Sequence, residues 1–142
     1  MAELINSLAD VGDRYDALYC DLWGCVHDGV RAFPEAVAAL RGFKAGGGTV
    51  VMVTNAPRPR SSVARQLQRL GVPDDCWDAI ATSGDAARLA MFEGVVGTKV
   101  WHVGEAHDAP FFEPPAILEN PAATAKVELD QAEGIVCTGP FD

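Results

Sequence analysis

The run TVVMV at residues 49–53 limits the possible folds of this chain more than any other feature of its sequence. Each of the five residues is β-branched or apolar, and the run follows the glycines Gly46, Gly47 and Gly48. A strand without polar alternation is typical of a parallel sheet whose two faces are both covered by helices. We therefore expect further short strands in this chain, with helices between them.

The predicted strands and helices alternate along the chain. Shorter apolar runs predict four other strands, at residues 16–20, 79–82, 98–103 and 134–137. Helical spacing of apolar residues predicts helices that start at Pro34, at a Ser61 cap and at a cap formed by Ser83 and Asp85. A short helix is also expected between the last two strands. This alternation predicts an α/β fold with a doubly wound, Rossmann-like parallel sheet.

The composition and net charge limit the kinds of molecule that this chain is expected to bind. The chain has 142 residues and a formal net charge of −9, which argues against a nucleic-acid groove and against attraction to an anionic membrane. No leader pattern is seen at the start and no apolar run approaches about 20 residues, so we expect a cytoplasmic protein. The four cysteines form no C-x-x-C pair and are expected to be buried, reduced thiols.

Polar residues follow the first two predicted strands at their carboxyl ends. Asp21 comes directly after the strand at 16–20, and Thr54 and Asn55 follow the run at 49–53. Ligands of open parallel sheets bind at this edge, so adjacent strands would bring the three side chains together. A carboxylate there can attack phosphorus, with Thr54 and the backbone N–H groups of residues 22–24 as donors to the phosphate. The alternative is that Asp21 caps a turn and Thr54 and Asn55 only begin a loop.

The segment DLWGCVHDGVRAFPEAVAAL, followed by VVMVTNAPRP, a helix and LGV, resembles the haloacid dehalogenase (HAD) superfamily. More narrowly it is similar to the class IIA branch, which includes p-nitrophenylphosphatase-like and pyridoxal-phosphate-phosphatase-like enzymes. In that branch a D-x-D-G-V motif precedes a flap hairpin, and a later strand ends in Thr-Asn or Ser-Asn. The likeness covers residues 15–90, and Asp28 and Gly29 suit a type I′ turn in the hairpin.

The resemblance implies a Mg²⁺-dependent phosphatase of a small phosphorylated metabolite that forms an aspartyl-phosphate. Asp21 would be the nucleophile and one Mg²⁺ ligand, with the backbone carbonyl of Trp23 as a second ligand. Thr54, Asn55 and Gly24 would bind the phosphate.

The resemblance also divides the chain into two parts. Residues 1–93 would be the N-terminal part of the core domain, and residues 94–142 the beginning of a class IIA cap, through which such proteins can form homodimers. The family's lysine, often in Gly-Lys-Pro, and its acidic Gly-Asp motif are not found in this sequence. Because the chain also ends straight after the strand at 134–137, we expect a fragment truncated within the cap and inactive alone.

Trp23 departs from the family pattern, which places a second aspartate at this position. That aspartate protonates the leaving group and then activates water, which is worth about 10²–10⁴-fold, and an indole cannot do either. His27 or Asp28 in the hairpin could replace it, or both could be ordinary hairpin residues. Without a strong acid, the enzyme should favour good leaving groups such as aryl or acyl phosphates.

Two other functions stay open at this point. Trp23 favours a HAD-fold module that binds a phosphorylated ligand or a protein without turnover. A receiver-like signalling domain is disfavoured, because the extra acidic residues and the last-strand lysine of receivers are not found.

Other polar and aromatic residues have weaker functional signals. Arg58 and Arg60 could attract an incoming phosphate, although exposed loop arginines are common. The histidines and acids of the segment after residue 101 match no usual zinc spacing and are expected in a loop at the edge of the cap, namely His102, Glu105, His107 and Asp108. Trp77 and Trp101 are expected to pack in the core or the cap.

Overall fold

The computed structural model describes residues 4–139, which form two compact units. The first comprises residues 4–54 and 61–81, and the second comprises residues 55–60 and 82–139. Helix α3 (Ser83–Phe92) falls in the second unit, whereas the family resemblance placed it before a cap that begins at residue 94. The core-and-cap division stays a prediction.

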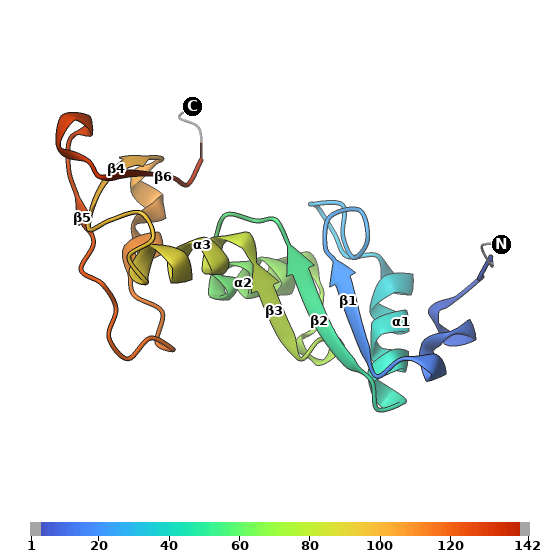
Figure 1. The fold of residues 1–142 in the computed structure, drawn as a ribbon. Helices are drawn as coiled ribbons and strands as arrows, with labels where there is room; N and C mark the ends of the chain where they lie inside the picture. Colours follow the sequence, from blue (N-terminus) through green and yellow to red (C-terminus); the bar gives the residue numbers. More distant parts are fainter. Residues whose placement is uncertain (1–3, 140–142) are drawn as a thin grey trace. The chain divides into compact units, whose positions relative to one another are not determined.

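The first unit contains a three-stranded sheet in the order β1-β2-β3. Its strands are β1 (Ala17–Asp21), β2 (Thr49–Thr54) and β3 (Ala79–Thr82), at the places that the apolar runs predicted. The first two are parallel, and the three arrows point the same way in Figure 1. The predicted α/β fold with a parallel sheet is confirmed.

Two helices join these strands. Helix α1 (Pro34–Ala45) begins at its proline, where the missing N–H is no loss, and helix α2 (Arg60–Leu70) ends before Gly71, whose φ is +86°. The Ser61 cap was wrong, because α2 begins one residue earlier. The N–H of Arg60 instead donates to Oδ2 of Asp85 at 3.1 Å, an acceptor far along the chain that local sequence could not indicate.

Only one face of this sheet is covered by the described residues. Val50, Met52 and Ile80 are buried on that face, where the buried side chains of the two helices meet them, namely Leu40, Phe43, Val63 and Leu67. The opposite face carries Tyr19 and Val53, which are 74% and 40% exposed. The TVVMV run predicted helices over both faces of this sheet. Within the described residues, helices cover only one of them.

The second unit contains helix α3 and a second parallel sheet in the order β5-β4-β6. The strands are β4 (Lys99–Val103), β5 (Ala125–Lys126) and β6 (Gly134–Cys137). Its core consists of five buried side chains, Met91, Phe92, Val100, Phe111 and Val136. Strands β4 and β6 were predicted, whereas β5 has two residues and is too short to leave a periodic signal.

Helix caps and connections in this unit differ from their predictions. Thr82 rather than Ser83 caps α3, because the Thr82 hydroxyl accepts the N–H of Asp85 at 2.9 Å. The described residues between β4 and β6 contain the 3₁₀ segments η4 (Ala106–Phe112) and η5 (Leu129–Gln131) in place of the expected short helix, and η4 contains Pro110, which an α-helix interior accommodates poorly.

The cysteines do not follow the predicted burial. All four are free, but only Cys76 is buried, while Cys25 and Cys137 are exposed.

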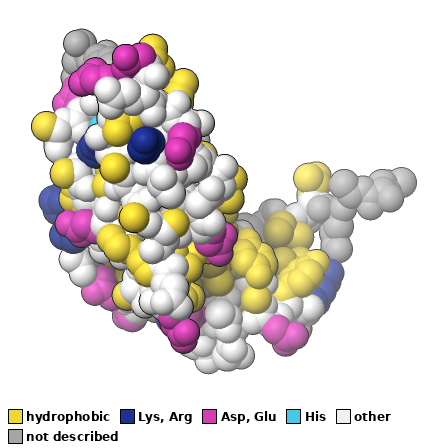
Figure 2. All heavy atoms as spheres, turned by 60° about the vertical axis from the view of Figure 1, so that its left-hand side comes forward, with side chains coloured by type: hydrophobic (Ala, Val, Ile, Leu, Met, Phe, Trp, Pro, Cys, Tyr) yellow, Lys and Arg dark blue, Asp and Glu magenta, His cyan; other side chains and the backbone are white. Residues whose placement is uncertain are grey.

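Acidic side chains are spread over the face shown in Figure 2, with few basic ones among them, in keeping with the net charge of −9. Among the described residues, no helix has both the length and the apolar character needed to span a membrane.

Candidate functional site

Asp21 and Thr54 lie at the same edge of the first unit's sheet. Asp21 is the last residue of β1 and pairs with Val53 of β2, so Thr54 is one position beyond this pair. Because the strands are parallel, both residues are at the carboxyl edge, as the strand pattern predicted. The Asp21 side chain is exposed and Thr54 is half-buried. At this edge the Asp21 carboxylate is therefore open to solvent, and Thr54, which carries a hydroxyl, lies one residue beyond its pairing partner.

A closed loop follows β1. The carbonyl of Leu22 accepts the N–H groups of Cys25, Val26 and His27 at 3.3, 2.8 and 3.2 Å. Leu22 and Val26 are buried in the core, with 3% and 0% of their surface exposed. Gly24 has a φ of +75°, a backbone conformation that costs a glycine little. The loop is thus anchored by its apolar residues and closed by its own backbone.

Two N–H groups that were expected to face a phosphate are engaged inside this loop. Leu22 N–H donates to Oδ1 of Asp21 at 2.7 Å, and Gly24 N–H donates to the carbonyl of His27 at 2.8 Å. A phosphate that used either donor would have to share or displace these bonds. Phosphate binding by Gly24 stays a prediction, and the bond observed here closes the loop.

The Trp23 side chain is exposed on this loop, with 67% of its surface accessible. Its ring meets the His27 ring edge-on, with centroids 5.9 Å apart and an interplanar angle of 88°. The indole also lies against Gly29, where an added Cβ would come within 2.5 Å of Trp23 Cζ3. The family's second aspartate is thus replaced by an indole that is held against the loop.

His27 is buried, with 4% of its surface exposed, and its Nδ1 accepts the N–H of Gly29 at 3.1 Å. Burial lowers the pKa of His27, and the negative charges of Asp28 and Asp21 only partly oppose this effect. The ring is therefore neutral at pH 7 and carries its proton on Nε2. A buried, neutral imidazole is a weak candidate for the proton donor that Trp23 replaces.

Asp28 acts in the turn of the hairpin. Its Oδ1 accepts the N–H groups of Val30 and Arg31, both at 2.8 Å, and these bonds lower the pKa of Asp28. The carboxyl is therefore ionised at neutral pH and cannot serve as an acid. The predicted type I′ turn is wrong, because no described residue other than glycine has a positive φ. A single antiparallel bridge between His27 and Ala32 replaces a regular hairpin.

Residues 55–60 belong to the second unit and are tied to the start of α3. The Ser83 hydroxyl bonds to the carbonyls of Asn55 and the next residue at 2.8 and 3.0 Å. Gly84 lies so close to the backbone of Arg58 that no Cβ would fit. The side chain of Asn55 is exposed, and Arg58 is half-buried. Contact of these two side chains with a phosphate stays a prediction.

The family model for haloacid dehalogenase-like hydrolases matches residues 18–114, which is more than half of the chain. The chain belongs to this family. The matched segment contains Asp21, the loop after it, and Thr54 with Asn55.

Two solved structures of HAD-like proteins are similar to this chain. A hydrolase of the haloacid dehalogenase-like family from Brucella suis 1330 is 38% identical, with a TM-score of 0.85, over 99% of this chain and 50% of its own. A 4-nitrophenylphosphatase from Thermotoga maritima is 19% identical, with a TM-score of 0.60, over 92% of this chain and 57% of its own, and shows the shared fold. No curated protein gives a significant match. The chain thus spans about half the length of the solved structures it matches.

Hydrolases of the HAD family generally use Mg²⁺, and the carboxyl edge fits this ion in part. Mg²⁺ prefers oxygen ligands and is often held by one or two carboxylates together with waters and phosphate oxygens. Asp21 offers one exposed carboxylate. Within residues 4–139 no group of three or more His, Cys, Asp or Glu side chains is arranged to hold a metal. The donor set is thus compatible with Mg²⁺ and contains a single carboxylate.

A second polar cluster lies in the second unit, around His102. Thr138 Oγ1 donates to Oδ2 of Asp108 at 2.6 Å and lies 2.9 Å from His102 Nε2. Lys126 Nζ is 3.3 Å from the other ring nitrogen, and burial lowers the pKa of His102. The sequence reading did not single out Thr138, although it directly follows a strand just as Asn55 does.

The other histidine of this segment approaches the same aspartate, because His107 Nε2 is 3.5 Å from Oδ1 of Asp108. His107 is exposed on η4, and its Nδ1 is 3.1 Å from Oε2 of Glu105. A short 3₁₀ segment thus stands where a loop was expected.

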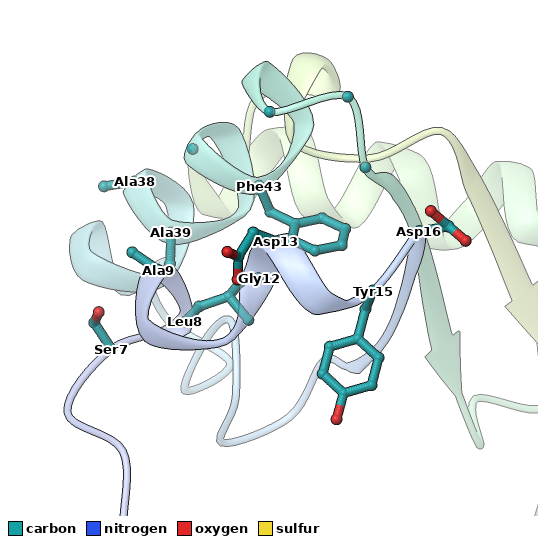
Figure 3. Close-up of a pocket in the computed structure, with 14 residues that line it drawn as sticks. Ser7, Leu8, Ala9, Gly12, Asp13, Tyr15, Asp16, Ala38, Ala39 and Phe43 are labelled. Carbon is teal, nitrogen blue, oxygen red and sulfur yellow. The ribbon is translucent and has the colours of Figure 1, made fainter.

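A cavity of about 520 Å³ lies at the opposite edge of the first sheet. Figure 3 shows Leu8 and Phe43 on its wall, with Tyr15 and Asp16 where the chain enters β1. These residues precede the strand, whereas Asp21 ends it, so the cavity is remote from the candidate catalytic edge. It is lined by the 3₁₀ segments η1 (Leu8–Asp10) and η2 (Gly12–Arg14) and by the glycine-rich end of α1, and no pattern in the sequence predicted it.

Proposed function

We propose that this chain carries the nucleophile half of a Mg²⁺-dependent phosphatase that acts on a small phosphorylated metabolite. The observation that supports this most is the register of β1 and β2, which puts Asp21 and Thr54 at one carboxyl edge. Membership of a hydrolase family agrees with this placement. We also propose a cytoplasmic location and a homodimer formed through the expected cap, residues 94–142.

The proposed reaction has two steps. A carboxylate oxygen of Asp21 attacks phosphorus, and the bond from phosphorus to the leaving oxygen breaks, which gives an aspartyl-phosphate and the free alcohol or phenol. Water then attacks this phosphorus and returns the Asp21 carboxylate and inorganic phosphate. A bound Mg²⁺, held by Asp21 and the Trp23 carbonyl, would neutralise charge on the phosphate.

The first step proceeds without a strong acid on the loop. Trp23 has no proton to give, His27 is buried and neutral, and Asp28 is ionised in its turn. The leaving oxygen must therefore depart as an anion or take its proton from water. This favours esters with good leaving groups, such as aryl or acyl phosphates.

The test combines binding with turnover. Orthovanadate binding in the presence of Mg²⁺ and hydrolysis of p-nitrophenyl phosphate are measured for the full-length protein that would carry this chain, as the wild type, as Asp21→Asn and as the surface control Asp130→Asn. We expect the wild type and the control to bind and hydrolyse, and Asp21→Asn or EDTA to abolish hydrolysis. Binding without hydrolysis would favour the non-catalytic HAD-fold module. Hydrolysis that survives Asp21→Asn or EDTA would contradict the proposal.

A further inference from the structure

Trp23 differs from the other two tryptophans in its exposure and its position. Its side chain is exposed, whereas Trp77 and Trp101 are both half-buried. It follows Asp21 by two residues, with the buried Leu22 between them. Asp21 and Trp23 are thus both exposed and flank one buried residue, so the indole and the nucleophilic carboxylate belong to the same short stretch of chain at the carboxyl edge.

The loop restricts where this indole can lie. His27 supports it edge-on, and His27 is itself fixed by burial and by the N–H of Gly29. Gly29 contacts the six-membered ring of the indole and leaves no space for a Cβ. The backbones of Trp23 and His27 also form a bridge. A large aromatic ring is therefore held in place while most of its surface stays open to solvent.

We infer that Trp23 is a substrate-binding residue whose indole stacks on a planar aromatic group carried by the phosphate ester. The inference rests on the proposed function and adds the specificity of that site. Aromatic rings attract one another in offset-stacked or edge-to-face geometries beyond what their buried area supplies. Because the ring is already held by the loop, little freedom is lost when it stacks on a ligand.

The chemistry of the leaving group supports the same conclusion. Both aryl and acyl phosphates can lose their leaving group without an acid, but only aryl esters offer a flat π face to an indole. The residue that replaces the family's acid thus also selects among the substrates that need no acid.

Binding of two phosphonates separates this role from a structural one. Affinities for phenylphosphonate and methylphosphonate are measured by calorimetry in Mg²⁺ buffer for the wild type, Trp23→Phe, Trp23→Leu and the control Trp77→Phe. We expect the wild type and the control to prefer phenylphosphonate by about tenfold. Trp23→Phe should keep most of this preference. Trp23→Leu should lose it, so that its affinities for phenylphosphonate and methylphosphonate become about equal.

The outcomes also separate this inference from the proposed function. If neither phosphonate binds the wild type, the phosphate site fails and the stacking role fails with it. If both bind but Trp23→Leu keeps the phenyl preference, the phosphate site holds and the stacking role is overturned. A second readout uses Trp23 fluorescence in a Trp77→Phe, Trp101→Phe background. Phenylphosphonate should change this emission and methylphosphonate should not.

Discussion

The indole of Trp23 lies directly against Gly29, and a Cβ at that glycine would come within 2.5 Å of Trp23 Cζ3. Gly29 also has a φ of +88°. The glycine of the Asp-Gly pair therefore has two functions, since it supplies the turn and leaves space for the ring. The position of the aromatic side chain beside Asp21 depends on a residue six positions away.

Substitution of Gly29 tests this dependence, and Gly71→Ala is its matched control. Gly71 has nearly the same φ, +86°, but nothing lies within 4 Å of its added Cβ. We expect Gly71→Ala to cost about 1 kcal/mol of unfolding free energy from backbone strain alone. Gly29→Ala should cost more and should change Trp23 fluorescence, because the ring must move. Equal costs and unchanged emission in the two variants would contradict the contact.

The burial of His27 predicts a dependence of stability on pH. Its pKa is lowered in the folded chain, so as pH falls below about 6.5 the unfolded chain takes up this proton first. Stability is therefore greatest above this pH and should fall toward pH 5, with a slope of at most about 1.4 kcal/mol per pH unit. Denaturant unfolding from pH 7.5 to 5 should show a shallower fall in His27→Gln than in the wild type.

The same experiment contains an internal comparison. Burial also lowers the pKa of His102, and Lys126 adds to this effect, so His102→Gln should flatten the pH profile in the same direction. An unchanged slope in His27→Gln would show that this ring accepts a proton as easily in the folded chain as in the unfolded one.

Arg88 should be the most costly arginine to remove from the second unit. Its guanidinium donates to Oδ1 of Asp85 at 2.9 Å and to the carbonyls of Phe111 and Glu113 at 3.1 and 2.6 Å, and its side chain is 11% exposed. We expect Arg88→Met to lower the unfolding free energy by about 2–3 kcal/mol, because it strands these acceptors. Thermal or denaturant unfolding measures the loss.

Two variants test whether the hydrogen-bond geometry of Arg88, rather than its charge, stabilises the fold. Arg88→Lys should restore little, since an ammonium group cannot reproduce three bonds from a planar fork. Arg65→Met, at an exposed position of α2, should change stability by less than about 0.5 kcal/mol. Comparable losses in Arg65→Met and Arg88→Met would contradict the assignment.

The uncovered face of the first sheet should bind apolar dyes. Tyr19, in the middle of the edge strand β1, is 74% exposed on that face, and Tyr15, in the segment before β1, is 63% exposed. We expect the chain to increase the fluorescence of anilinonaphthalene sulfonate while folded, and Tyr19→Lys to reduce this signal. Tyr15→Lys should change it less, because Tyr15 is outside the face. An equal reduction of the dye fluorescence in both variants would show that the dye binds elsewhere than on this face.

The strands and helices around the site could be predicted because their signals are local. TVVMV, Pro34 and the glycines after α1 each act through the backbone preferences of a few neighbouring residues. The placement of Asp21 and Thr54 at one edge of the sheet followed from strand order alone, since parallel strands end at one edge. These parts required no knowledge of side-chain packing.

The details that were missed depend on residues that are distant in the sequence. Asp85 accepts the first N–H of α2 from 25 positions along the chain, so no cap signal near Ser61 could indicate it. The N–H of Gly24 is engaged by His27 within the closed loop, which the D-x-D-G-V pattern does not describe. Asp28 and Gly29 favoured a type I′ turn, but the bonds of the Asp28 carboxylate to Val30 and Arg31 stabilise a different one.

The sheet order β1-β2-β3 leaves the strand of Asp21 hydrogen-bonded to one neighbour among the described residues. A strand at a sheet edge can open without disturbing the pairing on its far side. Amide hydrogens of β1 should therefore exchange with solvent faster than those of β2, through local opening rather than global unfolding. The lifetime of the closed edge would then set how long the carboxylate and Thr54 stay together, so a ligand or a strand that pairs with β1 would slow exchange at Asp21 first.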